Sequence, residues 1–60
     1  MNRIKEVLVE RGISQTWLAK QLGKSVKMVN YYTNNRHQPS LTTLLKIADI
    51  LKVDIRELLN

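Results

Sequence analysis

Positive charge is concentrated in the middle of this sequence, where no acidic residue separates the basic ones. No Asp or Glu lies between Glu10 and Asp49, a stretch that contains Arg11, Lys20, Lys24, Lys27, Arg36 and Lys46. From Gln38 onward basic and acidic residues balance, so the whole net charge of +5 comes from the residues before it. This asymmetry indicates a polyanionic partner, but excess Lys and Arg also keep small proteins soluble. Charge alone does not decide between the two.

Cys and His, whose side chains act as nucleophiles or bind zinc, are nearly absent. The chain has no Cys and a single His, His37. Zinc normally needs three or four protein ligands, and without Cys there is neither a thiolate nucleophile nor a disulfide. A chain of 60 residues buries too little surface to enclose a deep substrate cleft. We therefore expect a protein that is not an enzyme, works from its surface, and needs no cofactor, metal or small-molecule ligand.

The sequence contains no membrane or export signal. No apolar run approaches the ~20 residues of a membrane helix, and the N-terminal residues lack the apolar core of a signal peptide. We expect one domain over residues 1–60, located in the cytoplasm. Domains of this size often depend on close helix packing or on oligomerisation.

The spacing of apolar residues predicts five short helices and no strand. The predicted limits are Arg3 to Arg11, Ser14 to Gly23, residues 25–34, Ser40 to Leu51, and Asp54 to Leu59. Serine residues are expected to cap the second, third and fourth helices, and Gly12, Gly23 and Asn35 to end the first three. Asp54 and Glu57 predict a capping box at the start of the fifth.

The fourth predicted helix has more apolar residues than a small bundle needs to bury. One face is expected to consist of Leu41, Leu44, Leu45, Ala48 and Leu51. Ile47 and Ile50 widen this stripe. We expect Ile47 to lie in the core.

The second and third predicted helices, joined by a turn containing Gly23, form a pair whose second helix can enter a DNA major groove. Such pairs are common in all-helical domains, so the residue order is the more specific signal. It resembles the Cro/C1-type helix-turn-helix (XRE-like) family of bacterial and phage regulators along nearly the whole chain. The resemblance is carried by residues 15–25, Val29, Tyr32, Asn34, residues 39–41, Leu44, Ala48, Leu51, Val53, Asp54, Glu57 and Leu58.

Three positions depart from the usual pattern of that family. Lys24 stands where an apolar residue is common, Asn35 where glycine often ends the third helix, and Lys52 where glycine often separates the last two. Asn tolerates the left-handed conformation, whereas Lys52 makes the last junction harder to predict.

The resemblance implies a five-helix, lambda-repressor-like bundle whose third helix reads bases while neighbouring residues contact phosphates. The implied base-reading residues are Val26, Lys27, Asn30 and Tyr31. The implied phosphate-binding residues are Gln15, Thr16, Lys24, Ser25, Asn34 and Arg36. For Tyr31, a partly buried ring that supports the helix is an equally good interpretation.

Regulators of this family commonly pair through their C-terminal helices, which implies a homodimer on double-stranded DNA and a repressor function. We expect Ile55 to lie in the interface, whereas Ile50 fits the interface and the core equally well. The alternative function is a protein-interaction module, such as an antitoxin or an adaptor, because the apolar C-terminal helices could equally well bind a partner protein. Substituting base-reading residues distinguishes the two functions.

Overall fold

The computed structural model describes residues 1–60 and contains four α-helices, with no strand longer than an isolated bridge. The helices are α1 (Ile4–Arg11), α2 (Gln15–Leu22), α3 (Val26–Thr33) and α4 (Leu41–Leu51). The fifth predicted helix is a four-residue 3-10 helix, η1 (Ile55–Leu58). The all-α prediction is confirmed, but the count of five α-helices is not. None of the helices is both long and apolar enough to span a bilayer.

Hydroxyl caps start three of the helices at the predicted residues. The Oγ of Ser14 accepts a hydrogen bond from the backbone N–H of Trp17 at 3.0 Å, which begins α2. Ser25 and Ser40 make the same bond at the starts of α3 and α4, each at 3.1 Å. Each bond satisfies a backbone donor that the first helical turn leaves free. These short helices are therefore bounded by local chemistry.

Two residues other than glycine take the left-handed conformation after helices. Asn35 has φ 57° shortly after α3, and Lys52 has φ 58° directly after α4. Asn adopts this conformation at modest cost because its short polar side chain can hydrogen-bond locally, whereas the long side chain of Lys offers no such compensation. The structure thus places Lys52 in the role that glycine often fills, and the chain turns there all the same.

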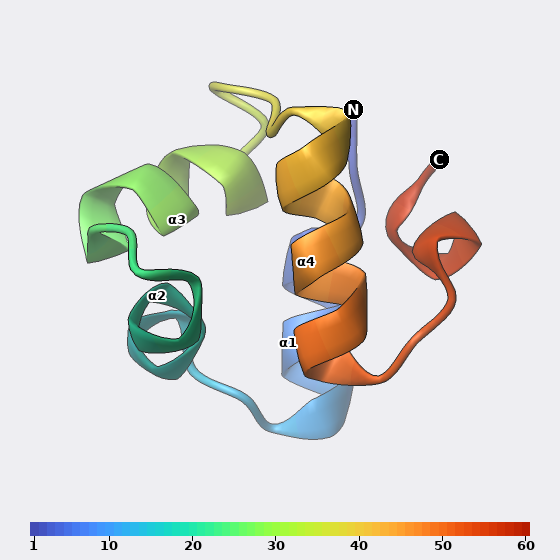
Figure 1. The fold of residues 1–60 in the computed structure, drawn as a ribbon, viewed down its shortest axis with the longest axis horizontal. Helices are drawn as coiled ribbons and strands as arrows, with labels where there is room; N and C mark the ends of the chain where they lie inside the picture. Colours follow the sequence, from blue (N-terminus) through green and yellow to red (C-terminus); the bar gives the residue numbers. More distant parts are fainter.

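The core is built from every helix of the chain. In Figure 1, α2 and α3 lie on one side of α4, and η1 lies on the other. Twelve buried apolar residues form one cluster: Ile4, Val7, Leu8, Leu18, Ala19, Val29, Tyr32, Leu44, Ile47, Ala48, Leu51 and Leu58. The two ends of the chain meet beside it, where the backbone N–H of Arg3 donates to the carbonyl of Leu58 at 2.9 Å.

The predicted inward face of α4 is partly wrong. Leu41 and Leu45 are 67% and 50% exposed, whereas Ile47 is fully buried as expected. The buried positions Leu44, Ile47, Ala48 and Leu51 follow the i, i+3, i+4, i+7 pattern of a single helix face. Leu45 lies about 100° around the axis from Leu44, outside that face. The stripe that faces the core is therefore narrower than the run of apolar residues.

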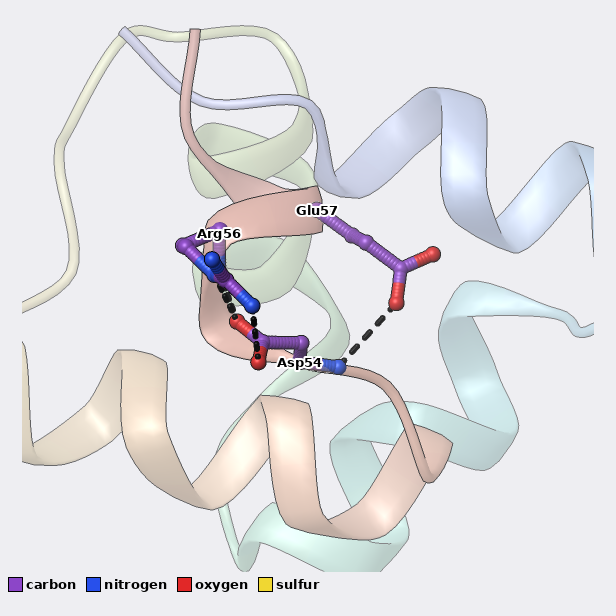
Figure 2. Close-up of polar contacts among 3 residues, drawn as sticks. All are labelled: Asp54, Arg56 and Glu57. Atoms are coloured by element: carbon purple, nitrogen blue, oxygen red, sulfur yellow. Dashed lines mark hydrogen bonds and ion pairs between the residues drawn. The ribbon is translucent and has the colours of Figure 1, made fainter.

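The predicted capping box at η1 is confirmed, and it carries an ion pair (Figure 2). Asp54 Oδ1 accepts from the backbone N–H of Arg56 at 2.8 Å, and Glu57 Oε2 accepts from the backbone N–H of Asp54 at 3.1 Å. The Arg56 guanidinium also donates to the Asp54 carboxylate at 3.0 and 3.1 Å. These hydrogen bonds lower the pKa of Asp54 below its ordinary value. The start of η1 is thus capped by the side chains of Asp54, which precedes it, and Glu57, which lies within it.

Candidate nucleic-acid interface

The pair formed by α2 and α3 is anchored to the core by buried side chains of both helices. Leu18 of α2 and Val29 of α3 are fully buried, and Ala19 and Tyr32 are 2% and 4% exposed. A small residue at Ala19 allows the two helices to approach closely, and close-packed cores are hard to compress. The inner face of α3 therefore fixes the direction in which its outer face points.

The four predicted base-reading residues share the outer part of α3. Lys27 and Asn30 are exposed, Val26 is 45% exposed, and Tyr31 is half-buried. The Lys27 Nζ lies 5.9 Å from the centroid of the Tyr31 ring, within the range of a cation–π contact. Positions 26, 27, 30 and 31 follow the helical repeat, so all four can face one partner at once. For Tyr31, this geometry agrees with the supporting role and leaves its hydroxyl contact a prediction.

Three amide side chains on this face are joined by hydrogen bonds, and we call them the outer amide cluster: Gln15, Asn30 and Asn34. The Asn30 Nδ2 donates to Gln15 Oε1 at 3.3 Å. The Asn34 Nδ2 donates to Asn30 Oδ1 at 3.1 Å. The structure thus brings a predicted base reader into contact with two predicted phosphate-binding residues.

The remaining phosphate-binding candidates, Thr16, Lys24, Ser25 and Arg36, are exposed. Neither Lys24 nor Arg36 takes part in an ion pair, because the two ion pairs of the chain are Arg3–Glu10 and Arg56–Asp54. The basic residues of the central segment therefore keep their charge available to a partner. The Ser25 oxygen is used in the cap of α3, which leaves its O–H free to donate.

The loop that carries Arg36 is tied to the end of α3. The backbone N–H groups of Arg36 and His37 both donate to the carbonyl of Tyr31, at 2.9 and 3.3 Å. The His37 ring stacks on Tyr32, with 5.9 Å between ring centroids. The exposed guanidinium of Arg36 is thus attached to an ordered backbone.

A second group of amides, which we call the inner amide cluster, consists of Asn2, Asn35 and Gln38. Asn2 is 5% exposed, and its Nδ2 donates to the Tyr32 carbonyl at 3.0 Å and to Gln38 Oε1 at 3.1 Å. Asn35 Oδ1 accepts from the backbone N–H of Asn2 at 2.8 Å and from Gln38 Nε2 at 3.1 Å. This cluster holds the N-terminus against the loop between α3 and α4.

The sequence interpretation missed Asn2. A polar residue before the first helix predicts an exposed end, and the two acceptors of its Nδ2 group lie 30 and 36 positions away along the chain. No local pattern signals such contacts. Only the fold therefore reveals that Asn2 supports the loop after α3.

The two predicted interface residues are less exposed than three leucine side chains of the C-terminal third of the chain. Ile50 and Ile55 are half-buried and pack against the core cluster. Leu41, Leu45 and Leu59 expose more surface, at 67%, 50% and 44%. The role of Ile50 and Ile55 in pairing stays a prediction.

A family model and a solved structure both match this chain over nearly its whole length. A helix-turn-helix family model matches residues 4–58, a range that runs from α1 to the end of η1. The chain is also similar to a crystal structure described as a "putative DNA-binding protein" from Bacteroides fragilis, with 47% sequence identity and a TM-score of 0.98. That similarity covers 100% of this chain and 97% of the other. No curated protein matches this sequence.

Proposed function

Because this chain belongs to the Cro/C1-type helix-turn-helix family, we propose that it is a transcriptional regulator that binds double-stranded DNA and reads sequence with α3. The observation that best supports this role is the outer face of α3. There Lys27 and Asn30 are exposed, and no acidic residue occurs from Arg11 to Ala48 to repel a phosphate backbone. The similar crystal structure, described as DNA-binding, supports the same partner.

Each base-reading residue has a chemistry suited to a base edge. Lys27 can donate to guanine O6 and N7, and Asn30 can pair with adenine through one donor and one acceptor. The 45% exposed Val26 can pack against a thymine methyl group. Phosphate contacts from the exposed side chains of Thr16, Lys24, Ser25 and Arg36 would fix the register of the complex without selecting a sequence.

The protein acts as a homodimer and represses transcription by occupying a promoter. A two-fold axis would place the two α3 helices about 34 Å apart, one turn of DNA, so the site should be a palindrome. Ile50 and Ile55 are the residues we assign to pairing, because both are half-buried and keep some apolar surface uncovered.

A salt titration with a pool of random duplexes tests the proposal. Duplexes that remain bound at the highest salt that still permits binding are sequenced. A steep loss of affinity with salt, together with a palindromic motif, is the expected result. A steep salt dependence without any motif would contradict sequence reading, and absence of binding at low salt would favour the protein-interaction alternative.

Substitutions separate base reading from phosphate binding. Lys27→Ala should relax the base preference by about 1 to 3 kcal/mol at one position, because a bidentate contact is lost. Lys24→Ala should instead weaken binding to all duplexes alike and reduce the log–log salt slope by about 1. Competition binding measures both effects. Lys5→Ala, which removes an exposed charge from α1, is the control and should change neither.

A further inference from the structure

We propose that Gln15 and Asn34 hold the amide of Asn30 in the orientation that recognises adenine, so that both act as positioning residues for sequence reading. This inference rests on the DNA-binding function proposed above. It gives Gln15 and Asn34 a role distinct from the phosphate contacts that the family resemblance implies for them.

The geometry of the outer amide cluster carries the inference. Asn30 lies in the middle of α3 and is exposed. Its amide is held at both ends: the nitrogen donates to Gln15 Oε1 at 3.3 Å, and the oxygen accepts from Asn34 Nδ2 at 3.1 Å. Gln15 comes from α2, whereas Asn34 lies one helical turn after Asn30. Two different parts of the chain thus restrain one exposed side chain.

The remaining hydrogen-bonding capacity of Asn30 matches adenine. An Asn side chain has two N–H donors and two acceptor sites on its oxygen. One donor is used by Gln15 and one acceptor by Asn34, which leaves one of each free. Adenine presents one acceptor, N7, and one donor, the N6 amino group, in the major groove. Guanine presents two acceptors there, so the same amide satisfies only one of them.

Both neighbours are needed to keep that amide from turning over. If the amide rotated about its Cβ–Cγ bond, its oxygen would face Gln15 Oε1 and its NH₂ group would face the NH₂ group of Asn34. Both hydrogen bonds would then be lost unless Gln15 and Asn34 turned over at the same time. A side chain that is already held in its binding orientation also loses less conformational freedom when it binds. The two neighbours therefore favour one order of donor and acceptor along the groove.

Four duplexes that differ at a single base pair test the inference. That pair is the one at which Asn30→Ala loses the preference found in the sequenced pool. The wild type should prefer the adenine duplex by about 5- to 150-fold, the factor that corresponds to one bidentate contact. Gln15→Ala and Asn34→Ala should each reduce this preference several-fold, toward the value of Asn30→Ala.

Two further variants distinguish positioning from other roles. Gln15→Glu keeps an oxygen that accepts from Asn30, so the preference for adenine should survive while the added charge weakens binding to all four duplexes alike. Gln21→Ala removes an exposed amide from α2 that makes no side-chain hydrogen bond, and it should change nothing. Thermal unfolding of each variant shows that the fold is retained.

The possible outcomes separate this inference from the proposed function. If Gln15→Ala and Asn34→Ala weaken binding equally on all four duplexes, both residues contact phosphates and the positioning role is overturned. A loss of preference in Gln15→Glu as large as in Gln15→Ala would also overturn it. In the Asn30→Ala background, Gln15→Ala should have no further effect on preference. A wild-type protein that binds none of the duplexes would instead overturn the proposed function itself.

Discussion

The two amide clusters lie around the same helix, yet they differ in burial and in how many of their hydrogen bonds are made. In the inner cluster, Asn2 is 5% exposed, both its Nδ2 donors are used, and its Oδ1 accepts from the backbone N–H of Ile4. In the outer cluster, Asn30 is exposed and keeps one donor and one acceptor free. Identical chemical groups are thus saturated in one place and available in the other.

The difference between the clusters follows from the cost of an unmade hydrogen bond. A buried polar group without a partner loses its water and gains nothing in return, so burial requires saturation. An exposed group keeps its water until a ligand replaces it. The inner cluster is therefore suited to hold the fold, and the outer cluster is suited to bind. Substitutions in the inner cluster should lower stability and leave base preference unchanged. Substitutions in the outer cluster should change base preference and leave stability almost unchanged.

Removal of the central amide of the inner cluster should give the largest effect on stability. Asn2→Ala leaves the buried N–H of Ile4 without its acceptor and should lower the free energy of unfolding by about 2 kcal/mol. Urea denaturation measures this change. Under conditions in which the variant is still folded, its base preference should equal that of the wild type. Stability equal to that of the wild type would mean that the inner cluster does not hold the fold.

The two left-handed residues provide a matched pair of substitutions to glycine. Lys52→Gly should raise the free energy of unfolding by up to about 1 kcal/mol, because glycine has no β-carbon to clash at φ 58°. Asn35→Gly gains less relief, because Asn tolerates this conformation, and it loses the oxygen that accepts from Asn2 and Gln38. It should therefore lower the free energy of unfolding by about 1 kcal/mol. Equal gains in both variants would show that the Asn35 amide contributes nothing.

Substitution in the outer cluster should leave stability almost unchanged. Asn30→Ala removes an exposed side chain from the outer cluster, so the free energy of unfolding should change by less than about 0.5 kcal/mol. Urea denaturation of this variant beside Asn2→Ala gives the direct contrast between the clusters. A loss as large as that of Asn2→Ala would remove the distinction.

The smallest effect is expected away from both clusters, at the exposed pair Asp54 and Arg56. Because the pKa of Asp54 is lowered in the folded protein, its contribution is complete above the unfolded pKa of about 4 and is lost as pH falls through the folded value. The pKa of Arg56 is raised, so its charge persists throughout this range. Asp54→Asn keeps an oxygen for the cap but cannot ionise. The acid-induced drop in its unfolding midpoint should be slightly smaller than that of the wild type.

Much of the secondary structure was predictable, because helix ends depend on neighbouring residues. Ser14, Ser25 and Ser40 cap helices as expected, and Asp54 forms its capping box with Glu57. The exposure of Leu41 and Leu45 was not predictable from periodicity. Which side of an apolar helix is covered depends on where the other helices lie. The last element also became a 3-10 helix, since its short segment offers room for little more than one turn.

The sequence by itself determined the helix boundaries, the cationic central segment and the resemblance to a family of regulators. All of these depend on residue type and on short spacing along the chain. Only the tertiary structure decided which amides are saturated, because both acceptors of the Asn2 Nδ2 group and the acceptor of the Asn30 Nδ2 group come from other elements. A side chain's role as support or as recognition group is set by what surrounds it in space. The sequence alone does not distinguish an Asn or Gln that supports the fold from one that recognises a base.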